Sequence, residues 1–160
     1  MRKVSEVNMM SSDEEIRRIL SSYKTVAVVG MSKDPHKDSR RVAAYLKGNG
    51  YRIIPVNPTA ASIMGMIAYP SLDEIPDESA REIEIVDVFR RSEDVSPVID
   101  QAIRLRQRFG KLRVVWMQLG IVNIDAAAVA SRAGLTVVMD RCMAKEHRRL
   151  MGRSSATNAS

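Results

Sequence analysis

Apolar and polar positions along the chain divide it into two kinds of segment. Short runs of apolar, β-branched residues predict buried strands, and longer segments with apolar residues three and four positions apart predict amphipathic helices. In chain order the pattern predicts a helix at 11–20, a strand at 25–30, a helix at 39–49, strands at 51–58 and 84–89, a helix at 96–109, a strand at 113–117, a helix at 125–133 and a strand at 135–139. Strands that alternate with helices pair in parallel through right-handed crossovers. The fold class expected is therefore α/β, with a Rossmann-like, doubly wound, mainly parallel sheet.

The length and composition fit one domain. The chain has 160 residues, of which 45% are hydrophobic, and this is enough for a single core. We expect an N-terminal segment at 1–22 that contains the short helix, a Rossmann-like domain at 23–147 and a tail at 148–160. The tail is small and polar without apolar periodicity, so we expect it to be disordered.

The charge balance favours an acidic partner. The formal net charge is +6, which suits nucleic acid, an anionic membrane or a phosphorylated small molecule. Aromatic residues make up only 4%, and no RNA-binding or helix-turn-helix signature is visible, so we expect no nucleic acid partner. No stretch approaches the length of a membrane span, which favours a cytoplasmic protein without a membrane partner. The single cysteine, Cys142, excludes an internal disulfide and a cysteine-rich metal site.

The candidate site begins where the strand at 25–30 ends. Gly30 is followed by a polar loop with Lys33 and then by a helix. A glycine allows a sharp turn, the following N–H groups are expected to point outward, and the start of a helix has a partial positive charge. Ligands of such sheets bind beyond the carboxyl ends of the strands, so this loop predicts a phosphate-binding site.

Two common phosphate motifs fit the loop poorly. The segment at 30–35 lacks the second and third glycines of the dinucleotide fingerprint. The second strand ends at Asn57 and Pro58, where an acidic residue would hold the ribose of NAD. The P-loop pattern is absent as well, because no Lys-Ser or Lys-Thr follows two spaced glycines.

Five ordered blocks resemble a known family. They read VAVVGMS at 26–32, GYRIIPVNP at 50–58, VDVFRR at 86–91, VWMQLGI at 115–121 and VVMDRC at 137–142. Together they resemble the small, single-domain CoA-binding proteins of the YccU-like family, whose fold is that of the CoA-binding domain of succinyl-CoA synthetase. The resemblance covers roughly residues 25–147.

The resemblance implies a site for coenzyme A in the loops after the first and second strands. Its diphosphate and 3′-phosphate would be held by backbone amides and by cations, and adenine would lie against the apolar surface at 56–58. The residues expected to bind the cofactor are Gly30, Met31, Ser32, Lys33, Lys37, Ser39, Arg40, Val56, Asn57, Pro58, Val88, Phe89, Arg90, Gln118 and Gly120. Relatives usually have Pro-x-Arg-Pro-Ser-Tyr where this chain has residues 35–40, so Lys37 replaces an arginine and Arg40 a tyrosine.

The resemblance implies binding without catalysis. The histidine-bearing domain of succinyl-CoA synthetase and its partner subunit have no counterpart in this sequence, and no catalytic or metal-binding residue is expected. We expect sensing, carriage or regulation through CoA or acyl-CoA, with a protein partner or a homo-oligomer as further possibilities. The alternatives are an NAD(P)-binding oxidoreductase domain, a subunit of an acyl-CoA-handling enzyme, or a scaffold with a vestigial site. We expect Cys142 to be a small buried residue and His147 a surface residue.

Overall fold

The computed structural model describes residues 11–152 and shows a five-stranded parallel sheet. Its strands, in spatial order, are β2 (Arg52–Val56), β1 (Thr25–Val29), β5 (Ile85–Val88), β6 (Val114–Met117) and β7 (Thr136–Val138). The chain leaves β1 toward one edge to form β2 and then returns to the other side of β1 to form β5. The order of the strands therefore reverses between β1 and β5, and at such a point the loops diverge and leave room for a ligand.

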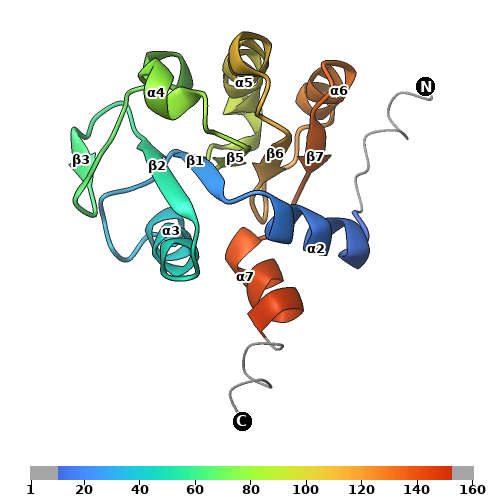
Figure 1. Cartoon of the computed structure of the whole chain (residues 1–160), viewed down its shortest axis with the longest axis horizontal. Helices are drawn as coiled ribbons and strands as arrows, with labels where there is room; N and C mark the ends of the chain where they lie inside the picture. Colours follow the sequence, from blue (N-terminus) through green and yellow to red (C-terminus); the bar gives the residue numbers. More distant parts are fainter. Residues whose placement is uncertain (1–10, 153–160) are drawn as a thin grey trace.

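Helices cover both faces of the sheet, as Figure 1 shows, and the doubly wound prediction is confirmed. One face is covered by α2 (Asp13–Ser22), α3 (Asp38–Gly48) and α7 (Met143–His147), and the other by α4 (Asp77–Ala80), α5 (Val95–Phe109) and α6 (Ile124–Arg132). Successive side chains of a strand point to opposite faces, so Val26 and Val28 pack toward α3 while Ala27 and Val29 pack toward α5. Each strand is thus buried on both faces, which explains its continuous apolar run.

The helix ends follow local signals in the sequence. Ser12 caps α2, because its hydroxyl accepts a hydrogen bond from the backbone N–H of Glu15 at 3.1 Å. Gly110 ends α5 in the left-handed region, with a φ of 79°. Both positions agree with the boundaries predicted from the sequence to within a few residues.

The segment between β2 and β5 contains small elements of secondary structure. The strands β3 (Ser62–Ile63) and β4 (Met66–Ile67) form an antiparallel hairpin, and a 3₁₀ turn, η1 (Leu72–Glu74), follows. A second 3₁₀ turn, η2 (Ser92–Asp94), precedes α5. The hairpin lies beside β2, where Tyr69 forms a parallel bridge with Val56.

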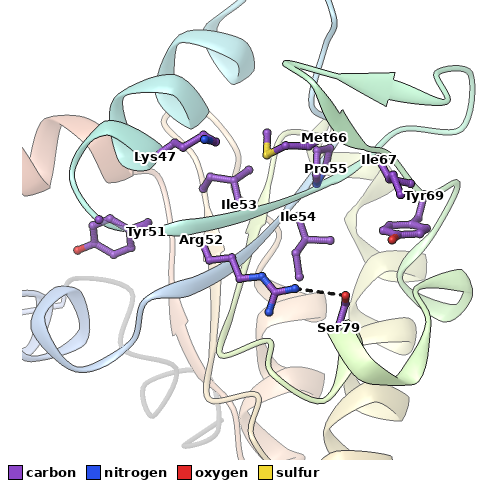
Figure 2. Close-up of a pocket in the computed structure, with 11 residues that line it drawn as sticks. Lys47, Tyr51, Arg52, Ile53, Ile54, Pro55, Met66, Ile67, Tyr69 and Ser79 are labelled. Atoms are coloured by element: carbon purple, nitrogen blue, oxygen red, sulfur yellow. Dashed lines mark hydrogen bonds between the residues drawn. The ribbon is translucent and has the colours of Figure 1, made fainter.

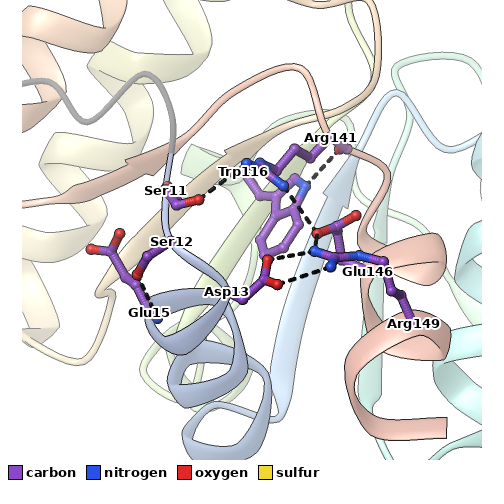
Figure 3. A network of polar contacts seen from close by, with 8 residues as sticks. All are labelled: Ser11, Ser12, Asp13, Glu15, Trp116, Arg141, Glu146 and Arg149. Atoms are coloured by element: carbon purple, nitrogen blue, oxygen red, sulfur yellow. Dashed lines mark hydrogen bonds and ion pairs between the residues drawn. The ribbon is translucent and has the colours of Figure 1, made fainter. Parts of the chain in front are cut away.

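The expected disorder of the tail is wrong for its first residues. Arg148–Gly152 forms a π-helical turn, η3, that continues α7. Polar contacts hold it to α2, because Arg149 forms ion pairs with Asp13 and with Glu146 (Figure 3). In the same network Glu146 also pairs with Arg141, whose backbone oxygen accepts a hydrogen bond from Trp116 Nε1 at 2.8 Å. Residues 153–160 lie outside the described residues.

None of the helices within residues 11–152 is both long enough and apolar enough to cross a membrane.

Candidate functional site

The turn after β1 lies directly against the loop after β5. Gly30 has a φ of +86°, and a Cβ atom at this position would lie 2.3 Å from the backbone oxygen of Phe89. The N–H of Phe89 donates to Val29 O at 2.8 Å and keeps the two segments together. Only glycine combines this backbone conformation with this close approach, so the structure of the turn by itself requires glycine at Gly30.

The expectation that the N–H groups after Gly30 point outward is wrong for Met31 and Ser32, and the N–H of Gly30 is also used within the protein. Those of Gly30 and Met31 both donate to the backbone oxygen of Val56, at 2.9 and 3.3 Å. The N–H of Ser32 donates to the hydroxyl of Ser39 at 2.9 Å. These donors are used to join the β1 loop to β2 and to α3, because a buried amide needs an acceptor.

The unpaired backbone N–H donors lie further along the chain, after Ser32. Among the described residues, the N–H groups of Lys33, Asp38 and Ser39 have no acceptor. The latter two belong to the first turn of α3, whose N-cap residue, Lys37, provides no side-chain cap. The exposed Asp38 carboxylate adds negative charge nearby but forms an ion pair with Arg41. The start of α3 therefore offers unpaired amides and a partial positive charge to an anion.

Four cations flank this position without a carboxylate partner among the described residues. Lys33 and Lys37 are exposed, whereas Arg40 and Arg90 are half-buried. The guanidinium of Arg40 donates to the backbone oxygen of Lys33 at 2.8 Å, which holds the loop against α3. None of these four side chains forms an ion pair within residues 11–152. Their charge remains available for an anionic ligand.

Asn57 joins the loops after β1 and β2. Its Nδ2 atom donates to Met31 O at 2.8 Å, and its Oδ1 atom accepts from the backbone N–H of Thr59 at 2.7 Å. Its amide is thus used within the protein, and the neighbouring Pro58 is the exposed surface of this loop.

The structure brings most of the predicted site residues together, since the loops after β2, β1, β5 and β6 leave adjacent strands at one edge of the sheet. Several of these residues do not reach its surface. Met31, Val56 and Val88 are at most 1% exposed and belong to the core, and Ser39 is buried by its bond to Ser32. Gly120 faces the last strand, because its N–H donates to Asp140 Oδ1 at 2.6 Å.

A cavity of about 420 Å³ opens next to these loops, between α3 and α7. Phe89 and Gln118 form part of its lining at the ends of β5 and β6. The other lining residues are Asp38, Arg41, Val42, Tyr45, Leu119, Ile121, Cys142, Ala144, Lys145 and Arg148. The cavity combines apolar walls with three cations, which suits a ligand that has both apolar and anionic parts.

A buried carboxyl group lies beneath this lining. Asp87, in β5, is fully buried, and its Oδ1 atom accepts a hydrogen bond from Gln118 Nε2 at 2.6 Å. Its other oxygen, Oδ2, has no partner among the described residues. Burial disfavours the charged form and raises the pKa of Asp87 to about 7, against which the hydrogen bond from Gln118 acts only in part.

Ten of the twelve residues that line the cavity were not among the predicted site residues. Asp38, Arg41, Val42 and Tyr45 have helical spacing and therefore share one face of α3, a signal that the sequence contains. Cys142 was expected to be buried but is partly exposed at the cavity. His147 was expected on the surface but is buried, with a hydrogen bond of 2.8 Å to the Tyr45 hydroxyl.

A second hollow, of about 590 Å³, follows the outer edge of β2, away from the glycine turn (Figure 2). Arg52, Ile54, Pro55 and Tyr69 are among its lining residues, and Arg52 donates to Ser79 Oγ across it at 3.3 Å. Pro55 has no N–H to offer on this edge, so another strand cannot pair regularly with β2 there.

Comparison with known proteins gives the family. Residues 24–148 match the family described as CoA binding domain. The chain belongs to this family. It is 39% identical over 136 residues to the uncharacterized protein YneT of Bacillus subtilis, a match that covers 85% of this chain and 94% of YneT. The resemblance proposed from the five sequence blocks is thereby confirmed.

Two further matches place the family in context. A hypothetical protein from Pyrococcus horikoshii is 40% identical, with a TM-score of 0.81, over 89% of this chain and 94% of that chain. Acetate–CoA ligase [ADP-forming] II of Archaeoglobus fulgidus is 44% identical over 57 residues, which are 34% of this chain and 8% of the ligase. The CoA-binding domain of this chain therefore has a short, similar counterpart within a much longer enzyme.

Proposed function

We propose that this protein binds coenzyme A or an acyl-CoA without catalysis, at the carboxyl ends of its parallel strands, for sensing, carriage or regulation. The match of residues 24–148 to the CoA-binding family is the observation that carries the proposal. The geometry supports it, because unpaired amides, four cations that have no carboxylate partner within residues 11–152, and a cavity with apolar and cationic walls all lie near the point where the strand order reverses.

Each part of the cofactor has a chemically suitable surface. The diphosphate would bind at the amides of Lys33 and the first turn of α3, with Lys33, Lys37 and Arg90 neutralising its charge. Arg40 would complete the contact from the helix. The adenosine would lie against Pro58, because Val56 is buried and Asn57 uses its amide internally. The pantetheine arm would enter the cavity past Phe89 and Gln118.

A second candidate is a subunit of an acyl-CoA-handling enzyme. The local identity to an ADP-forming acetate–CoA ligase favours this candidate over an NAD(P)-dependent oxidoreductase. The loop at 30–35 also lacks the glycines of the dinucleotide fingerprint. In both candidate functions that involve CoA, the same site holds the cofactor. Catalysis would need groups from a partner.

A thermal-shift panel with the whole chain tests the proposal. CoA at a hundred times its Kd should stabilise the fold by about 2.7 kcal/mol, whereas NAD, NADP and ATP at equal concentration should not. Stabilisation by NADP alone would contradict the proposal and favour the oxidoreductase alternative. Stabilisation by acetyl-CoA well beyond that by CoA would indicate that the thioester is the preferred ligand.

A charge reversal locates the phosphate contact. Lys33→Glu places a negative charge beside the proposed diphosphate and should weaken CoA binding roughly tenfold or more, since a charge-assisted bond is lost and repulsion is added. Lys47→Glu is the matched control, because Lys47 is exposed at the other end of α3 and lines the outer hollow. Calorimetry should show nearly unchanged affinity for this control. A larger loss in Lys47→Glu would move the site to the outer edge of β2.

A further inference from the structure

Gln118 lies where its polar side chain can form a hydrogen bond with a ligand in the cavity. It is 3% exposed, lines the cavity and donates its Nε2 atom to Asp87. Its Oε1 atom has no partner among the described residues. The Nε2 atom uses one of its two N–H groups on Asp87, and the unpartnered Oε1 atom is the hydrogen-bond acceptor that Gln118 can offer to a ligand in the cavity.

Within residues 11–152, the bond from Gln118 is the one hydrogen bond that the Asp87 carboxylate receives. Its register neighbours are Val28 on β1 and Trp116 on β6, which are both fully buried and not titratable. If Asp87 binds a proton, Oδ2 becomes a donor that needs an acceptor. Gln118 Oε1 is the atom that can provide it, through a second hydrogen bond that pairs the carboxylic acid with the amide. That bond uses one of the two lone pairs of Oε1 and holds the oxygen toward Asp87, which weakens Oε1 as an acceptor for a ligand N–H.

We propose that Asp87 is a positioning residue that keeps Gln118 Oε1 available to the cavity, so that Gln118 binds a ligand hydrogen-bond donor more strongly while Asp87 is ionised. This inference rests on the proposed function, in which the donor is an amide N–H of the pantetheine arm. Protonation of Asp87 weakens Gln118 Oε1 as an acceptor and so weakens the binding of the pantetheine arm, while the contacts to the phosphates at the start of α3 are unaffected.

The sign and size of the effect follow from the buried carboxyl. With the pKa of Asp87 near 7, the fraction of protein with an ionised carboxylate rises steeply between pH 6 and pH 8. Because the phosphate contacts remain when Asp87 is protonated, the apparent Kd for CoA should rise by about two- to tenfold between pH 8 and pH 6, with tenfold as the limit for full exclusion of the ligand by the proton.

Other titratable groups face the same cavity and must be separated from Asp87. Those on α3 are Asp38, Arg41 and Tyr45; the others are Cys142 at the N-cap of α7, Lys145 in α7 and Arg148 in η3. His147 on α7 bonds to Tyr45, and its pKa is lowered by burial and by the nearby Lys24 and Arg148. All of these groups, and the phosphates of CoA itself, remain in Asp87→Asn. The difference between the two pH profiles therefore belongs to Asp87.

The test is calorimetric titration of CoA into the wild type and Asp87→Asn at pH 6, 7 and 8. The same titrations use 3′-phosphoadenosine 5′-diphosphate, which lacks the pantetheine arm. We expect a decrease in affinity toward pH 6 in the wild type that is about two- to tenfold larger than in the variant. The fragment should show no difference between the two proteins, because it does not reach Gln118.

A second variant keeps the test decisive if Asp87→Asn does not fold. Gln118→Met has a similar length but no acceptor, and it should bind CoA with the pH profile expected for the ligand alone. Equal pH profiles for CoA in the wild type and in the folded variants would overturn the role of Asp87 and leave the proposed function intact. Absence of CoA binding to the wild type at every pH would instead overturn the proposed function, and this inference with it.

Discussion

Replacement of Gly30 by alanine should destabilise the protein through two separable effects. The first is the left-handed backbone, because a φ of +86° costs an L residue with a side chain about 1–2 kcal/mol. The second is the Cβ atom, which would lie 2.3 Å from Phe89 O and force the loops after β1 and β5 apart. Such overpacking typically costs about 1–3 kcal/mol, so the total should be about 2–5 kcal/mol.

Gly50→Ala is the matched control. Gly50 has a φ of +93°, and a Cβ atom there would meet nothing within 4 Å. This variant should therefore lose only the backbone part, about 1–2 kcal/mol. The difference between the two variants isolates the contact with Phe89.

Urea and thermal unfolding followed by circular dichroism measure both variants. For a chain of this size the contact should lower the Tm of Gly30→Ala by roughly 2–12 °C beyond that of Gly50→Ala. Equal losses in the two variants would refute the reasoning, because they would mean that the β1 and β5 loops can separate at no cost.

Three further predictions concern stability. The stability gained by Asp87→Asn over the wild type should be larger at pH 8 than at pH 5 by at most roughly 3 kcal/mol, because the raised pKa of Asp87 means that the wild type loses stability as pH rises from the unfolded value of 3.8 to about 7; a pH-independent difference in chemical denaturation would contradict it. Arg149→Met should lower the Tm at pH 7 and lower it less once Asp13 is protonated, since the hydrogen bond from Arg149 is the main cause that lowers the pKa of Asp13 and only the ion pair with Glu146 then remains. Asn57→Ala should cost about 1–3 kcal/mol by leaving Met31 O without its donor, whereas a loss below 0.5 kcal/mol in urea titrations would show that water replaces the amide.

The order of elements and the position of the site follow from the sequence because they depend on periodicity and topology. Apolar runs such as that at 26–29 define buried strands, and right-handed crossovers then bring the loops after β1, β2 and β5 to one edge. Asp87 is the polar residue within the buried run at 85–88, and a buried carboxyl group needs a hydrogen-bond partner.

The details that the sequence does not reveal depend on which donor meets which acceptor. The N–H groups of Gly30 and Met31 face Val56 rather than solvent, because the chain leaves β1 toward β2. The ordered turn at 148–152 depends on ion pairs between residues far apart in the chain, such as Arg149 and Asp13. The polarity of this segment alone predicts disorder, because it contains no information on ion-pair partners more than a hundred residues away.

A crystal structure of the whole chain with CoA tests the central claim most directly. The account predicts the diphosphate at the first turn of α3, beside Lys33 and Arg90, with the pantetheine arm in the cavity against Phe89 and Gln118. CoA bound instead in the hollow along β2, or an empty site in crystals grown at saturating CoA, would contradict it.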